Sequence, residues 1–133
     1  MAASLGQAFA EAFAAGNEDA VRRLLHDEVD FRGLTPNKTW QASGPGDVIS
    51  EVIRPWLEDS GEIDELVEVS THAFADTESV SYRFRGRDEE GEYVCEQHAY
   101  LTERDGSIDW MRVVCSGGCA PSPAELRQSP AVR

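Results

Sequence analysis

The sequence is short of basic residues and contains no long apolar run. Its 12 lysines and arginines stand against 25 aspartates and glutamates, which gives a formal net charge of −13. Because neutralising phosphates requires clustered Lys and Arg, this balance argues against a nucleic-acid partner. No apolar stretch approaches the ~20 residues that span a bilayer, so we expect no membrane partner either.

Cysteine is also scarce, and the three cysteines are an odd number that does not suit a disulfide framework. The N-terminal stretch has no basic segment and carries Glu11 inside its apolar part, unlike a signal peptide. We therefore predict a cytoplasmic protein. Cys115 and Cys119 leave two alternatives: a disulfide or redox pair, or a metal site together with His98 and Glu96. Since C-x3-C is a weak spacing signal, we predict no metal and no cofactor.

The 133 residues have the length of one domain, and the first half has a helical pattern. Apolar spacing predicts a first helix between Ser4 and Gly16 and a second helix capped by Asn17. A third helix is expected to begin at Ser43 and to be kinked or ended by Pro55.

From Leu66 onwards the apolar period changes from helical to two, which is typical of strands. We predict strands over Leu66–Ala75 and Glu78–Arg87, and two more within Glu92–Cys115. Before the third helix, Val29–Arg32 is expected to be a short extended segment, and Leu34–Ala42 a loop. Helices followed by strands predict an α+β fold, with three helices packed in the concave side of a curved antiparallel sheet.

The last two strands are expected to join at Asp105-Gly106, a dipeptide that favours a tight hairpin turn. Counting back from this turn pairs His98 with Val113. A three-residue loop over Glu89–Gly91 then brings the preceding strand onto the same face. This predicted pocket face carries a mixed set of side chains: Tyr82, Phe84, Glu96, His98, Tyr100, Met111, Val113 and Cys115.

An imidazole beside a carboxylate on this face suggests acid/base chemistry. We predict His98 as the proton carrier, Glu96 as its tuning partner and Tyr82 as a donor to a developing oxyanion. The predicted substrate-binding wall comprises Phe9, Trp40, Phe84, Tyr100, Met111, Val113 and Cys115.

Each of these roles has a structural alternative. His98 can be a core histidine satisfied by Tyr82 or Glu96, and Glu96 can form a salt bridge with an arginine. The predicted face also depends on the strand register. A one-residue slip would turn Cys95, Gln97 and Ala99 inward in place of Glu96, His98 and Tyr100.

Three stretches of the chain resemble the nuclear transport factor 2-like, or SnoaL-like, cone-fold superfamily: FAAGNEDAVRRLLHDEVDF, GPGDVISEVIRPWL and HAYLTERDGSIDWMRV. The resemblance implies a single cone domain over residues 1–118 with one internal pocket. The prolines that follow predict an irregular, proline-rich tail over residues 119–133. The superfamily includes ketosteroid isomerases, polyketide cyclases, dehydratases, epoxide hydrolases and proteins that only bind or dimerise, so the fold alone does not settle the function.

The ketosteroid isomerase catalytic set is mostly missing from this chain. The resemblance places Phe9 at the position of its tyrosine, Gly33 near its base and His98 at its protonated acid, which argues against that activity. The histidine pair of scytalone dehydratase has a loose parallel in His72 and His98.

These considerations predict a protein that binds a small, largely apolar ligand in its cone. Whether it is an enzyme stays open; if it is one, we expect a cofactor-independent isomerase, cyclase or dehydratase. The alternative is a non-catalytic ligand carrier or a dimerising accessory protein. The resemblance also implies a homodimer through the outer sheet face, which is predicted to carry Ala99, Leu101, Trp110 and Val114.

Overall fold

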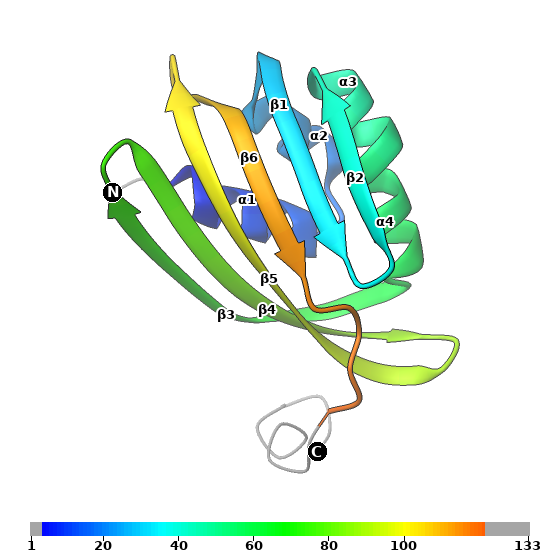
Figure 1. The fold of residues 1–133 in the computed structure, drawn as a ribbon. Helices are drawn as coiled ribbons and strands as arrows, with labels where there is room; N and C mark the ends of the chain where they lie inside the picture. Colours follow the sequence, from blue (N-terminus) through cyan, green and yellow to red (C-terminus); the bar gives the residue numbers. More distant parts are fainter. Residues whose placement is uncertain (1–3, 122–133) are drawn as a thin grey trace.

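A computed structural model describes residues 4–121 and contains a six-stranded curved sheet with the helices on its concave side (Figure 1). The strand order is β2-β1-β6-β5-β4-β3. The strands are β1 (Leu25–Thr35), β2 (Lys38–Ser43), β3 (Glu62–Phe74), β4 (Thr77–Asp88), β5 (Gly91–Arg104) and β6 (Ser107–Cys115). The α+β cone predicted from the sequence is confirmed. Of the predicted tail, residues 122–133 lie outside the described residues.

The first two helices begin at the predicted caps. Helix α1 (Leu5–Ala14) follows Ser4, whose hydroxyl accepts a hydrogen bond from the Gln7 amide, and α2 (Glu18–Leu24) follows Asn17. The third helical segment consists of α3 (Pro45–Val48), a π-helical turn η1 (Ile49–Ile53) and α4 (Arg54–Asp59). Pro55 therefore does not end the helix, because the π turn before it carries the chain past the missing amide donor.

The segment predicted to be a loop after Gly33 is instead the second half of a hairpin. Strands β1 and β2 pair antiparallel around Pro36 and Asn37, and Gly33 pairs with Trp40 across them. Strand β1 also lies parallel to β6, with Gly33 opposite Val113, so the sheet is mixed rather than antiparallel throughout. Gly33 continues the strand because β2 on one side and β6 on the other pair with its backbone.

Strand β5 differs from the sequence-derived register by one residue on both of its edges. Only Glu89 and Glu90 connect β4 to β5, because Asp88 pairs with Gly91. The Asp105-Gly106 turn is as predicted, but a bulge leaves Asp109 as an extra residue on β6. Thr102 therefore faces Trp110, and side chains on β5 point to the face opposite to the one expected.

The core lies between α1, the third helical segment and the concave face of the sheet. Phe9 and Phe13 of α1 are fully buried and contact Tyr82 and Phe84 of β4, with ring centroids 5.8–6.4 Å apart. Trp56 of α4 packs edge-on against Phe13, which closes the aromatic cluster. Within the described residues, no helix combines the length and apolar character needed to cross a membrane.

Candidate ligand pocket

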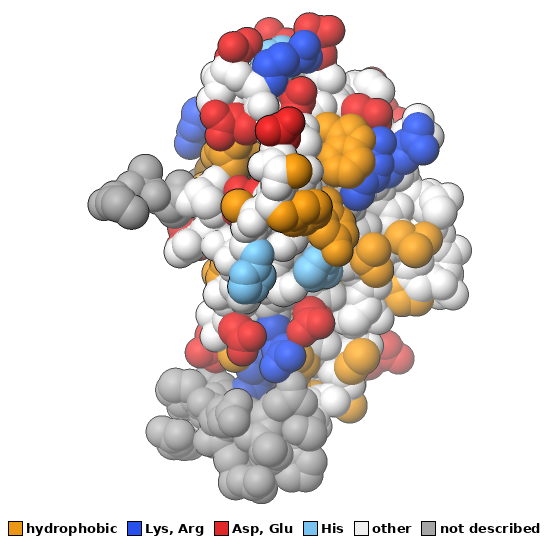
Figure 2. Space-filling model, turned by 60° about the vertical axis from the view of Figure 1, so that its left-hand side comes forward, with side chains coloured by type: hydrophobic (Ala, Val, Ile, Leu, Met, Phe, Trp, Pro, Cys, Tyr) orange, Lys and Arg blue, Asp and Glu red, His pale blue; other side chains and the backbone are white. Residues whose placement is uncertain are grey.

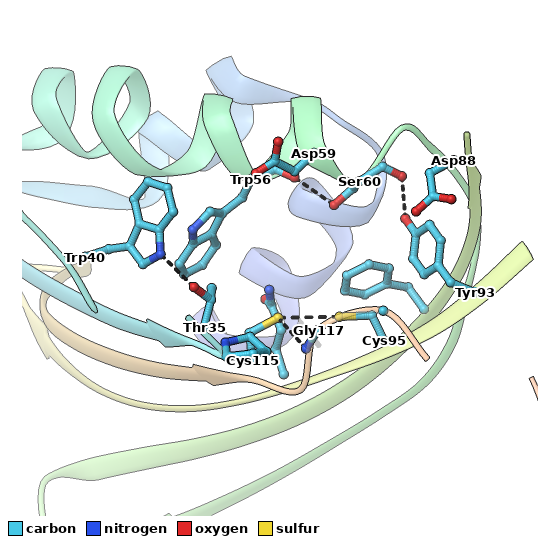
Figure 3. A pocket seen from close by; sticks show the side chains of 14 residues that line it. Thr35, Trp40, Trp56, Asp59, Ser60, Asp88, Tyr93, Cys95, Cys115 and Gly117 are labelled. Carbon is cyan, nitrogen blue, oxygen red and sulfur yellow. Dashed lines mark hydrogen bonds between the residues drawn. The ribbon is translucent and has the colours of Figure 1, made fainter. Parts of the chain in front are cut away.

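A cavity of about 190 Å³ opens between the β1–β2 hairpin, the end of α4 and the concave face of β4 and β5 (Figure 3). Its walls come from segments far apart in the sequence, so the fold assembles it. The lining residues are Thr35, Pro36, Trp40, Trp56, Asp59, Ser60, Phe84, Asp88, Tyr93, Cys95, Gln97, Cys115, Gly117 and Gly118.

Aromatic side chains form most of the cavity wall. Trp40 and Trp56 meet edge to face at 6.0 Å, and Phe84 and Tyr93 meet in the same way at 6.4 Å. The Trp40 indole donates a hydrogen bond to the Thr35 hydroxyl at 2.9 Å, which holds its ring in place. These contacts give the pocket a rigid apolar wall before any ligand binds.

Polar groups are placed at the rim and at the sheet side of the cavity. Asp59 and Asp88 are exposed at the rim. The Tyr93 hydroxyl donates to the Ser60 carbonyl at 2.6 Å, and burial raises the pKa of Tyr93 to about 12, so this phenol stays neutral at physiological pH. Gln97 is almost fully buried, and its Oε1 accepts a hydrogen bond from the Tyr82 hydroxyl.

Two thiols face each other in the cavity wall. The Sγ atoms of Cys95 and Cys115 are 3.5 Å apart, and both cysteines are free (Figure 3). The Gly117 amide donates to the Cys115 sulfur at 3.4 Å. The Cys95 thiol, followed by the Gln97 side chain and the Gly117 amide, lowers the pKa of Cys115 to about 6 against the opposing effect of burial. The same contact with Cys115 raises the pKa of Cys95.

The prediction that Glu96, His98 and Tyr100 face the pocket is wrong. In the observed register these side chains lie on the outer face, which we define as the sheet surface turned away from the helices. Histidine and apolar side chains gather there in Figure 2. The physical reason is the one-residue offset at both edges of β5, which exchanges the two faces of the strand.

Contacts on the outer face show what these residues do instead. The His98 Nδ1 atom lies 2.5 Å from the Ser81 hydroxyl, and its ring packs against Tyr100 at 5.0 Å. Glu96 forms a salt bridge with Arg83 at 2.9 Å, the alternative anticipated for it. His72 lies on the same side of the sheet, paired with Ser79, so the two histidines form no pair inside the cone.

The remaining predicted site residues divide between the pocket wall and the core behind it. Trp40, Phe84 and Cys115 line the cavity. A second group is buried without lining it: Phe9, Tyr82, Met111 and Val113. Tyr82 reaches the cavity only through its hydrogen bond to Gln97.

Several pocket residues were missed at the level of sequence. Cys95 and Gln97 were assigned to the opposite face, and the only signal for them was the alternative one-residue slip. Ser60, just after α4, and Tyr93, near the start of β5, lie outside the predicted pocket face, and no local pattern marks either as bordering a cavity. Their hydrogen bond joins positions 33 residues apart.

The cysteine pairing also differs from the two alternatives considered. Cys115 meets Cys95, whereas Cys119 lies in a backbone bridge to Val94 and is exposed. Among residues 4–121, no group of three or more His, Cys, Asp or Glu side chains is placed to hold a metal ion.

No family model and no curated protein match the sequence. Solved structures do match. A protein named a candidate polyketide cyclase from Xanthomonas campestris is 24% identical, with 83% of this chain and 86% of that one covered and a TM-score of 0.65. A protein named a candidate isomerase from Rhodopseudomonas palustris is 14% identical, with 86% and 91% covered and a TM-score of 0.68.

A third matching structure is described by the name of this fold. An NTF2-like protein from Burkholderia thailandensis is 15% identical, with 86% of this chain and 92% of that one covered and a TM-score of 0.64. At these identities the likeness establishes the fold alone. The chain therefore has the nuclear transport factor 2-like cone fold, in agreement with the resemblance seen in its sequence.

Proposed function

We propose that this protein binds a compact, uncharged, largely apolar molecule in the cavity of its cone. The supporting observation is the cavity lining, which combines aromatic walls with an absence of Lys, Arg and His among the described residues. A carboxylate ligand would have no counter-ion there and would face Asp59 and Asp88 at the rim. The volume of about 190 Å³ suits roughly one ring, since a cavity of ~150 Å³ holds benzene.

A cofactor-independent reaction of the isomerase, cyclase or dehydratase type is the enzymatic form of this proposal. The fold neighbours named for such activities support it as a class. None of the three histidines lines the cavity, so any proton transfer falls to the carboxylates, thiols or phenol of the lining. A non-catalytic carrier is the alternative.

The free thiols of all three cysteines accord with a cytoplasmic location, whether the protein is an enzyme or a carrier.

Tryptophan fluorescence tests the binding proposal directly. Two of the three tryptophans, Trp40 and Trp56, line the cavity, and Trp110 lies on β6 outside it. In a Trp110→Phe protein the emission therefore comes only from the cavity. We expect benzyl alcohol to change this emission with a Kd on the order of 1 mM, as befits a ligand of about eight heavy atoms.

Two controls sharpen this experiment. Benzoate, which matches benzyl alcohol in size but carries a charge, is expected to bind at least about tenfold more weakly. A Gly118→Leu substitution places a side chain at the cavity wall, where a Cβ lies 3.4 Å from Tyr93, and is expected to abolish the signal. Equal responses to both compounds, or an unchanged response in the Gly118→Leu protein, would contradict the proposal.

A further inference from the structure

The paired thiols in the cavity wall are not needed for binding an apolar ligand. Cys95 comes from β5 and Cys115 from the end of β6, and both line the same cavity. Their Sγ atoms are 3.5 Å apart, within hydrogen-bond distance for sulfur. The thiol pair adds a reactive group to a cavity wall that is otherwise mainly aromatic.

The surroundings of the pair distinguish its two members. The Cys115 sulfur accepts from the Gly117 amide at 3.4 Å and hydrogen-bonds with the Gln97 side chain, and the Cys95 sulfur lies 3.5 Å from it. Gln97 is oriented for this role because its Oε1 accepts from Tyr82, which leaves its amide hydrogens for the sulfur. Cys95 is the more buried thiol, and its own donor, the Ser116 hydroxyl, is distant at 3.9 Å. Negative charge is thus favoured on Cys115.

We propose that Cys115 is a nucleophile that adds to a compact α,β-unsaturated carbonyl compound held in the cavity, with Cys95 as its proton partner. The inference rests on the proposed ligand pocket and names a substrate class for it. The Gly117 amide, the Gln97 side chain and the Cys95 thiol converge on the Cys115 sulfur, and the aromatic walls hold an apolar enone against it. The same contacts lower the pKa of Cys115, which favours its thiolate form.

The reaction balances without an oxidant or a cofactor. The Cys115 thiolate forms a C–S bond to the β carbon, and the C=C electron pair moves to give an enolate. Cys95 has then lost the anion that accepted its S–H, so it transfers this proton to the α carbon and recovers one from water. The product is a thioether, and reversal of the same steps releases the enone.

The pH profile of the reaction distinguishes an activated Cys115 from an ordinary thiol. A pKa below the ordinary cysteine value of about 8.5 raises the thiolate fraction of Cys115 at pH 7. The intrinsic nucleophilicity of a more acidic thiolate is lower, so the two effects oppose each other in the rate at one pH. The inflection of the profile is therefore the decisive measurement.

The test uses the full chain, cyclohexenone and iodoacetamide, with intact-mass and peptide-level mass spectrometry. We expect one cyclohexenone adduct at Cys115, retained in Cys119→Ser and lost in Cys115→Ser. Alkylation of Cys115 by iodoacetamide is expected to rise through an inflection near pH 6, and this inflection moves toward the ordinary thiol value in Cys95→Ser. Because serine nearly matches cysteine in size, all three variants are expected to retain the fold.

Modification of the exposed Cys119 without reaction at Cys115 would overturn the proposal, as would an inflection for Cys115 near pH 8.5. Benzyl alcohol binding to the Cys115→Ser, Trp110→Phe protein tests the ligand pocket independently of the Cys115 nucleophile. If this variant binds benzyl alcohol while the parent's Cys115 does not react, the nucleophile is refuted and the ligand pocket stands. If neither binding nor reaction occurs, both fail.

Discussion

At the scale of single residues, Gly33 explains how the cavity wall is built. It lies on β1 opposite Trp40, and a Cβ at this position would come within 2.7 Å of the Trp56 ring. Trp56 has no room to move aside, because Phe31 at 5.9 Å and Trp40 at 6.0 Å flank its ring. The absence of a side chain at position 33 therefore lets the indole lie directly on the strand and form the cavity wall.

We expect Gly33→Ala to destabilise the protein by ~1–3 kcal/mol, because the added methyl overpacks a rigid aromatic contact. Urea unfolding measures this change, and the emission of the cavity tryptophans is expected to shift with it. Gly46→Ala in α3 is the matched control, since nothing lies within 4 Å of a Cβ there. A Gly33→Ala protein as stable as the Gly46→Ala protein would show that Trp56 does not need this space.

At the scale of elements, β5 determines which chemistry reaches the cavity. It pairs with β4 and with β6 in two hairpins, and each pairing is shifted by one residue from the register predicted by counting from the turns. The Asp88 carboxylate accepts from the Glu90 amide at 2.8 Å, which supports the short connection to β4. On the other side, the Thr102 hydroxyl donates to the Asp109 carboxylate, which supports the bulge in β6. Two local side-chain contacts thus place thiols and an amide inside and the histidine outside.

Neighbouring substitutions on β5 test this register. Ala99 is fully buried, whereas Tyr100 is 41% exposed on the outer face. We expect Ala99→Asp to cost more than ~4 kcal/mol or to prevent folding, because it buries an unpaired charge. Tyr100→Asp is expected to retain the fold, with a cooperative thermal transition by circular dichroism. The opposite result would restore the register in which Tyr100 faces the cavity.

At the scale of the whole molecule, the outer face carries apolar side chains that residues 4–121 leave exposed. Leu34, Phe74, Tyr100 and Val114 are between 41% and 56% exposed, and Leu34 pairs directly with Val114. Ala99 and Leu101, predicted for this surface, are instead in the core. Trp110 is half-buried beneath the Arg112 guanidinium, 4.5 Å from its ring. We propose that a second copy of the chain covers this face, with Trp110 near the contact.

Light scattering is expected to give the mass of a dimer at micromolar concentration. Val114→Glu places a charge within the apolar part of the outer face and is expected to produce monomers that remain folded. Glu58→Arg, on the helical side of the molecule, is the control and should leave the dimer intact. A monomeric parent protein, or a Val114→Glu dimer as stable as the parent, would contradict an interface on this surface.

The sequence by itself determined the helices and the last four strands of this fold, because local physical chemistry specifies them, whereas the β1–β2 hairpin was not predicted. The caps at Ser4 and Asn17, the turn at Asp105-Gly106 and the inward positions of Tyr82 and Phe84 all follow from short-range patterns. The same patterns were sufficient for the resemblance to the cone fold. Alternation along β5 was also predicted correctly, although not which of its two faces is buried.

Only the tertiary structure decided which side chains of β5 line the cavity. The two faces of a strand alternate with the same period. A connection to β4 that is one residue shorter than expected and one bulge at Asp109 were therefore enough to exchange the faces of β5. Both errors shifted β5 by one residue. The predicted pairings with β4 and with β6 therefore agreed on the same wrong face, and neither revealed the error in the other. Cys95 meets Cys115 for the same reason: their contact depends on hydrogen-bond pairing between strands, which no local feature of either strand encodes.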